Sequence, residues 1–234
     1  HDFIELSDGT IIIVMTTSGM ADSSDNTVYV VGLNETGDSL WTRNFGFFRS
    51  PLAGVGSVVA YDESTFIFAA TIEYNDYYSI YTLMRMNQNG NIIWSRRDSS
   101  DRYGYGCIVD IDYCGNIISE YNLWFTLFDN HGELMDYFGM AYAGDVWIRQ
   151  NHDIKTVQFS PYGMVFVGEG VIPGFDDYIG YMVYLDSEYD TVWSLHYGAT
   201  EPTTGDHDAL YGVEVVSNPV RGYLEGLIGV GMIY

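Results

Sequence analysis

Short apolar segments alternate with polar turn sequences along the whole chain. Ile11 to Met15 is a continuous apolar run, which is typical of a strand buried on both faces. Asp8-Gly9 comes just before it, and Asp-Gly is a strong signal for a hairpin turn. No stretch shows the sustained periodicity and the capping residues of a helix. The pattern therefore predicts strands throughout and almost no helix.

A pattern of turn and tryptophan recurs four times. It is clearest in residues 33–46, LNETGDSLWTRNFG, with the turn at Gly37 and the tryptophan at Trp41. The other copies read MNQNGNIIW (86–94), FDNHGELMD (128–136) and LDSEYDTVW (185–193). The third copy has Asp136 in place of the tryptophan, and the fourth has Tyr189 in place of the turn glycine. Turn positions spaced 53, 42 and 57 residues apart indicate propeller blades or a related β-array.

We predict a single all-β domain over residues 1–234, a β-propeller-like array of four-stranded antiparallel blades. The apolar runs group into four full blades and a C-terminal half blade. The expected ranges are about 2–46, 55–98, 104–140 and 154–198, with a partial blade at 210–234. The link between the third and fourth blades, Gly139 to Asp153, is expected to be the longest loop.

The recurring tryptophans are expected to be structural anchors between blades. A tryptophan at the start of an outer strand can bury about 150–250 Å² in the gap between neighbouring blades. Replacing Trp41 or Trp193 with alanine is accordingly expected to cost about 3–5 kcal/mol each. Trp94 is assigned the same role, while Asp136 is expected to leave the third blade less tightly packed.

The repeat of a glycine turn followed four residues later by tryptophan resembles the repeats of secreted bacterial β-propeller proteins. Many of those repeats belong to large surface proteins that carry a sorting domain. Residues 35–41, ETGDSLW, also resemble the repeat of quinoprotein-type propellers, in which a Thr-Gly turn precedes a tryptophan that docks between blades. The resemblance implies a toroid and a secreted or cell-surface location. It implies no particular activity, because propellers carry many unrelated functions.

The charge of the chain excludes some classes of partner. There are 32 acidic and 9 basic residues, and the formal net charge is −23. Such a chain repels the phosphate backbone of nucleic acids and anionic membrane surfaces. No run approaches the ~20 apolar residues of a membrane-spanning helix, so membrane insertion is not expected. The chain begins at His1 without a signal peptide, as a processed or excerpted chain would.

Two acidic loops are candidates for a weak calcium site. They contain Asp22 and Asp25 in one loop, and Asp206 and Asp208 in the other. Carboxylate oxygens are suitable ligands for calcium, whereas zinc would require histidine or cysteine at ligand spacing, which neither loop supplies. The alternative is that both loops are simply solvated. No other cofactor is expected.

A tyrosine-rich segment is the candidate binding surface. Tyr74, Asn75, Asp76, Tyr77 and Tyr78 follow one another, and tyrosine with asparagine and aspartate is a composition used in recognition of proteins or sugars. The alternative is that these rings pack against neighbouring blades.

No residue set in the sequence indicates catalysis. There is no G-x-S-x-G nucleophile motif, and the pair His152-Asp153 is the nearest approach to an oriented general base. We therefore expect a non-enzymatic extracellular or surface domain that acts in binding or self-assembly, in an adhesive or structural role. The alternatives are an enzyme that acts on glycans in the central funnel and a quinoprotein-like envelope scaffold. An enzyme would direct an arginine (Arg43, Arg85, Arg149 or Arg221) towards several carboxylates.

The C-terminal segment 222–234, GYLEGLIGVGMIY, is apolar, rich in glycine and nearly uncharged. A strand of this kind at the edge of a sheet is a template for pairing with another chain. We expect it to be covered by a protein partner or by further copies of the same chain, through β-augmentation. The residues assigned to this edge are Gly222, Tyr223, Leu224, Leu227, Ile228, Val230, Ile233 and Tyr234.

Overall fold

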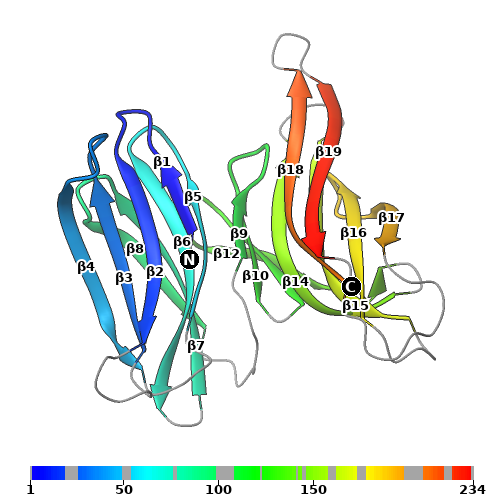
Figure 1. Ribbon diagram of the computed structural model, residues 1–234, viewed down its shortest axis with the longest axis horizontal. Helices are drawn as coiled ribbons and strands as arrows, with labels where there is room; N and C mark the ends of the chain where they lie inside the picture. Colours follow the sequence, from blue (N-terminus) through cyan, green and yellow to red (C-terminus); the bar gives the residue numbers. More distant parts are fainter. Residues whose placement is uncertain are drawn as a thin grey trace. The chain divides into compact units, whose positions relative to one another are not determined.

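The computed structural model is built from strands (Figure 1). It describes residues 2–18, 26–48, 54–75, 78–98, 108–121, 123–140, 142–143, 146–157, 162–172, 178–197, 208–218 and 223–232. Within these ranges there is no helix, which confirms the all-β prediction. The described residues accordingly include no helix long and apolar enough to cross a membrane.

Three four-stranded sheets form the first three blades, and in each of them every strand pairs with the next one along the chain. The first contains β1 (Asp2–Glu5), β2 (Ile11–Ser18), β3 (Asn26–Leu33) and β4 (Ser39–Phe48). The second contains β5 (Gly54–Ala60), β6 (Thr65–Asn75), β7 (Tyr78–Asn87) and β8 (Ile92–Asp98). The third contains β9 (Ile108–Ile111), β10 (Ile117–Tyr121), β11 (Trp124–Phe128) and β12 (Leu134–Gly139). The predicted propeller-like array of antiparallel blades is confirmed.

The fourth sheet has five strands, and two strands follow it in the part of the chain that the structure describes. It contains β13 (Tyr142–Ala143), β14 (Val146–Val157), β15 (Gly163–Val171), β16 (Tyr178–Asp186) and β17 (Thr191–Tyr197). The last sheet is the pair β18 (Ala209–Asn218) and β19 (Tyr223–Met232). The predicted long loop from Gly139 to Asp153 is wrong, because β14 already begins at Val146. Register shifts at Ile148/Gln150 and Asn151/Asp153 break the alternation of buried and exposed residues, which hides this strand in the sequence.

The predicted single domain contains two compact units, which we describe separately. The first consists of His1–Val109, Ser119–Asn122 and Phe128–Met135, and the second of Asp110–Ile118, Leu123–Leu127 and Asp136–Tyr234. In the first unit the core lies between the first two sheets, where Ile12, Val30, Phe66 and Met86 are fully buried. In the second unit Val157, Val165 and Val167 form the corresponding core with Met182 of β16 and Val213 of β18. Burial of such branched and aromatic side chains, at about 25 cal/mol per Å², is the main stabilising contribution in each unit.

Polar side chains on the inner strands connect successive sheets. Asp2 Oδ2 accepts from Val58 N at 2.9 Å in the first unit, while Asp110 Oδ2 accepts from Thr156 N at 2.6 Å and Asp153 Oδ2 from Val213 N at 3.0 Å in the second. In each aspartate Oδ1 accepts from the next backbone N–H. Burial raises the pKa of the Asp110 carboxyl, because desolvation outweighs these two donors and the nearby Lys155. The aspartate of the pair His152-Asp153 therefore satisfies a backbone donor of the next sheet.

Candidate functional site

The first tryptophan anchor holds the turn of the next sheet in the first unit. Trp41 lies between Gly32 of its own sheet and Gly90, the turn glycine between β7 and β8. Its indole Nε1 donates to the Gln88 carbonyl at 2.7 Å, and Arg43 Nε donates to the Gly90 carbonyl at 2.7 Å. A tryptophan and the arginine two residues later thus clamp one glycine turn.

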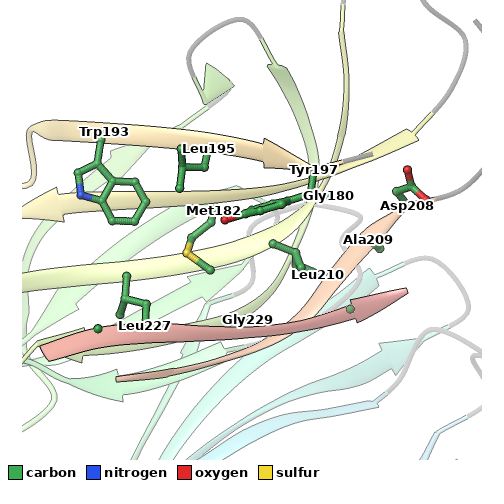
Figure 2. Close-up of a pocket in the computed structure, with 12 residues that line it drawn as sticks. Gly180, Met182, Trp193, Leu195, Tyr197, Asp208, Ala209, Leu210, Leu227 and Gly229 are labelled. Atoms are coloured by element: carbon green, nitrogen blue, oxygen red, sulfur yellow. The ribbon is translucent and has the colours of Figure 1, made fainter. Parts of the chain in front are cut away.

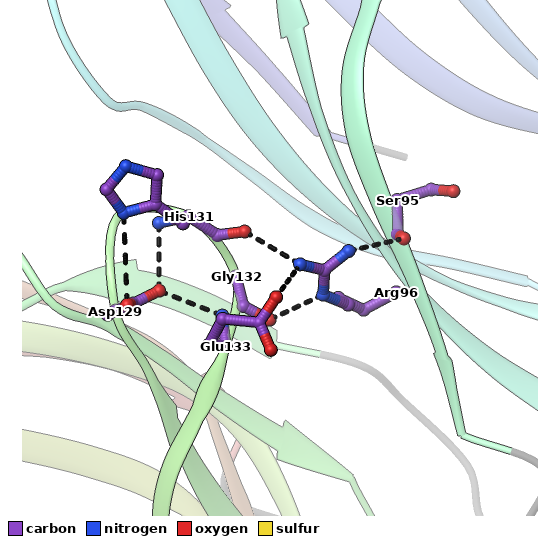
Figure 3. Close-up of polar contacts among 6 residues, drawn as sticks. All are labelled: Ser95, Arg96, Asp129, His131, Gly132 and Glu133. Carbon is purple, nitrogen blue, oxygen red and sulfur yellow. Dashed lines mark hydrogen bonds and ion pairs between the residues drawn. The ribbon is translucent and has the colours of Figure 1, made fainter.

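The same clamp recurs one sheet later. Trp94 lies against Gly132, and a Cβ on Gly132 would be 3.0 Å from its ring. Arg96 Nε donates to the Gly132 carbonyl at 2.7 Å, and the same guanidinium binds the His131 carbonyl at 3.0 Å and the Glu133 carboxylate (Figure 3). The sequence signal for this clamp is Trp-x-Arg beginning four residues after a turn glycine, at residues 41–43 and 94–96. Trp147-Ile148-Arg149 follows no such turn, and Arg149 lies over the Trp147 ring instead.

A bulge before each tryptophan places its ring. The register of the last two strands shifts between Gly32 and Leu33 in the first sheet, between Arg85 and Met86 in the second, and between Tyr184 and Leu185 in the fourth. In each sheet the residue before the shift pairs with the recurring tryptophan. The extra residue ahead of it is apolar and about half exposed, as Leu40, Ile93 and Val192 are in turn (54%, 50% and 55%). Trp193 therefore occupies the same strand position as Trp41 and Trp94.

In five of the described hairpins an acidic or amide residue stands three positions before the turn residue and closes the hairpin. Asp129 Oδ1 accepts from His131 N at 2.9 Å and from Glu133 N at 2.8 Å. Asn34 and Asn87 make the same two bonds in their own turns, as do Asp112 and Asp186. Such a side chain replaces backbone partners within the turn. Asparagine or aspartate three residues before the turn residue is therefore a second sequence signal for these hairpins, besides Trp-x-Arg.

The turn at Asp129 predicts a specific dependence on pH. Hydrogen bonds from Glu133 N and His131 N lower the pKa of Asp129 below its usual 3.8. The ionised side chain therefore stabilises the fold above pH 3.8, and this contribution is lost as the pH falls through the lower pKa of the folded state. We expect an NMR titration to give a pKa below 3.8 for Asp129.

The variant Asp129→Asn is the matched control for that titration. It keeps the Oδ1 acceptor that Asn34 and Asn87 supply in their turns. Any advantage in melting temperature of the parent chain over this variant should shrink as the pH falls from about 5 to about 3. An advantage that grows over this range would contradict the assignment.

In the second unit an aromatic exchange replaces the clamp between the third and fourth sheets. Asp136 stands at the tryptophan position, and Tyr189 occupies the turn with φ +66°. The Tyr189 ring stacks on Phe138 at 5.0 Å, and Phe138 stacks on Phe125 at 5.0 Å. Burial, together with the nearby Asp112, raises the pKa of the Tyr189 hydroxyl. At this junction the aromatic side chain comes from the turn, and the looser packing expected of the third blade stays a prediction.

At the fourth sheet the anchor lines an open cavity of about 620 Å³ (Figure 2). Trp193 and Leu195 of β17 lie on one side with Met182 of β16, and Leu210 of β18 and Leu227 of β19 lie on the other. The Trp193 ring stacks on Tyr184 at 5.6 Å. Leu195 takes the place that Arg43 and Arg96 have in the clamps. No turn glycine lies on the Trp193 ring in the part of the chain that the structure describes.

The strand β19 borders this cavity. It pairs with β18 along one edge, and none of the described strands pairs with its other edge. Leu227 and Gly229 face the cavity, while Ile228 and Val230 are 54% and 64% exposed. Of the assigned edge residues, Gly222, Ile233 and Tyr234 lie outside the described ranges. Tyr223 and Leu224 belong to β19, but their side chains are not described.

The other candidate sites fall largely outside the described residues. This holds for Asp22, Asp25, Asp206, Asp76 and Tyr77. Asp208 is buried, and its N–H donates to the Tyr178 carbonyl at 3.1 Å. The backbones of Tyr74, Asn75 and Tyr78 lie in β6 and β7, without a description of their side chains. Calcium binding and recognition through the tyrosines remain predictions.

The described polar residues serve mainly as structural partners. They include no group of three or more histidine, cysteine, aspartate or glutamate side chains that could hold a metal. Arg85 pairs with Asp62 at 2.7 Å and donates to the Asn130 carbonyl at 3.1 Å, and Arg149 lies over the Trp147 ring at 4.1 Å. Arg221 lies outside the described ranges. His152 Nε2 is 3.6 Å from Glu169, and its ring contacts Tyr211 at 4.8 Å.

Comparison with known proteins gives structural similarity only. No family model and no curated protein matches the sequence. A protein of unknown function from Bacteroides caccae is similar with a TM-score of 0.43 and 10% identity, covering 84% of this chain and 81% of that one. A member of the DUF4221 family from Bacteroides vulgatus is similar with a TM-score of 0.41 and 11% identity, covering 75% of this chain. The chain spans 64% of the length of that second protein.

Proposed function

We propose that this chain is a non-enzymatic β-propeller-like domain that acts by binding or self-assembly, with its site at the cavity and the outer edge of β19. The observation that carries this proposal is the position of Trp193. Trp41 and Trp94 each contact a turn of the next sheet. Trp193 occupies the same strand position in its own sheet, but its ring lines an open cavity. An aromatic ring in an apolar pocket can anchor a side chain of a partner, and the open outer edge of a strand can pair with a strand of that partner.

The chemistry of the cavity favours binding over catalysis. Among the described residues that line it, Asp208 is the one carboxylate, and the others are glycine or have apolar or aromatic side chains. Hydrolysis of a glycosidic bond generally requires two carboxylates on either side of that bond. An apolar cavity bordered by backbone donors and acceptors suits a strand of another polypeptide better than a sugar ring.

The proposed setting is extracellular or at the cell surface. It is supported by the resemblance of the repeat to secreted bacterial propellers and by a net charge of −23, which keeps a chain with apolar edge residues in solution. The partner is a protein, which includes further copies of this chain. Neither nucleic acid nor insertion into a membrane is part of the proposal.

Hydrogen exchange of β19 tests this function. With the edge open, the amide groups of Tyr223–Met232 that do not pair with β18 should exchange much faster than those of β16. Protection that rises with protein concentration, together with a larger mass in sedimentation, would identify self-assembly. Full protection of β19 in a chain that stays monomeric would contradict the proposal, because the edge would then be covered within the molecule.

A further inference from the structure

The other hairpins of this chain show what lies on an anchor tryptophan. In the first unit the hairpin β7–β8 places Gly90 on Trp41, and the turn between β11 and β12 places Gly132 on Trp94. Each of these hairpins supplies the third and fourth strands of its sheet. The described fifth sheet has only its first two strands, β18 and β19, and the cavity lies where the outer strands would pack on β16 and β17.

We propose that the cavity and the outer edge of β19 bind a β-hairpin of a partner polypeptide, which adds the third and fourth strands of the fifth sheet and sets its turn glycine on Trp193. This inference rests on the proposed function and names the ligand of the same site. The site continues the interface between the fourth and fifth sheets. Trp193 and Leu227 both pack against the buried cluster of that interface, which includes Val213 of β18.

The lining defines the chemistry of that hairpin. Arg43 and Arg96 bind the carbonyl of the turn glycine in the clamps, but Leu195 offers no donor at this position. The contact with the turn therefore depends on the Trp193 ring, and not on a hydrogen bond to the turn carbonyl. The strand next to β19 should have apolar residues on the face towards Met182 and Trp193, and glycine at the turn, where a Cβ would meet the ring.

A hairpin fits this site better than a second copy joined through β19. Two copies related by a twofold axis would pair their β19 strands antiparallel and present the same face of both sheets. Each copy would then bring its own β16 and β17 to that face, above the strands of the other. These strands already border the cavity over β19, so the two pairs would compete for one space.

The test uses a peptide taken from the chain itself. Residues 78–98 comprise β7, the turn with Gly90, and β8, which together form the hairpin that contacts Trp41. A cyclised form, closed by a disulfide between added terminal cysteines, is already folded and loses less entropy on binding. We expect it to slow amide exchange in Tyr223–Met232 in a saturable manner, with at least about tenfold weaker binding to the Trp193→Ala chain.

Two controls separate this proposal from the proposed function. The same peptide with Gly90→Ala should also bind at least about tenfold more weakly, and Tyr162→Ala, which removes an exposed ring outside the cavity, should leave binding unchanged. If the peptide has no effect at about 1 mM while β19 becomes protected as protein concentration rises, the hairpin is the wrong ligand and the binding function stands. If β19 is fully protected in the monomer without peptide, both proposals fail.

Discussion

Replacing Trp41 with alanine is expected to destabilise the protein by about 3–5 kcal/mol, because it removes a ring that packs against the buried core of the first two sheets. The ring touches Gly32 and Gly90 on opposite sides and stacks on Phe66 at 6.5 Å. The variant would also leave the Gln88 carbonyl without its donor. For Trp193→Ala we expect only about 1–2 kcal/mol, since this ring borders a cavity that is already open, so that less new empty space is created.

Urea denaturation of both variants measures this difference, with the slope of the transition checked for constancy. Trp147→Ala is the control for loss of an exposed ring, because Trp147 is 43% exposed, and it should cost no more than about 1 kcal/mol. The repeat by itself predicts equal losses for Trp41 and Trp193. Equal losses of about 4 kcal/mol would mean that Trp193 is enclosed, and the proposed binding site would then be wrong.

The blades could be predicted from the sequence because their signals are local. A turn glycine, a tryptophan four residues later and an apolar run on either side depend only on neighbouring residues, and they locate four of the five sheets closely. The first half of β14 was missed for a local reason too. Two register shifts interrupt its alternation, so Val146 to Gln150 does not look like part of the strand that ends at Val157.

The clamp and the cavity could not be predicted, because each depends on contacts between segments distant in sequence. Trp41 is 47 residues from Gln88, and Arg96 is 36 residues from Gly132. The exchange at the third junction shows the difference. Asp136 and Tyr189 look like two independent losses from the repeat, yet they belong to one junction. No tryptophan ring lies against the turn of the next sheet, so a side chain fits at the turn position. Tyr189 stands there, and its ring stacks on Phe138 of β12.

Gly90→Ala is expected to destabilise the protein by about 2–5 kcal/mol, although it adds a single methyl group to a hairpin turn. One part is the positive φ of +74°, which costs an alanine about 1–2 kcal/mol. The other part is steric, because the new Cβ would lie 2.7 Å from the Trp41 ring. That ring cannot move away, since Gly32 supports its other face and Nε1 is bonded to the Gln88 carbonyl, so overpacking adds about 1–3 kcal/mol.

Gly37→Ala separates these two parts. Gly37 has φ +84° in an equivalent turn, but nothing lies within 4 Å of its Cβ position, so this variant should lose only about 1–2 kcal/mol. The double variant Trp41→Ala/Gly90→Ala should be more stable than the sum of the single losses predicts, by about 1–3 kcal/mol, because removing the ring removes the clash. Strict additivity in this cycle, or equal losses for Gly37→Ala and Gly90→Ala, would show that the ring does not rest on the turn, and Trp193 would then have no precedent for holding one.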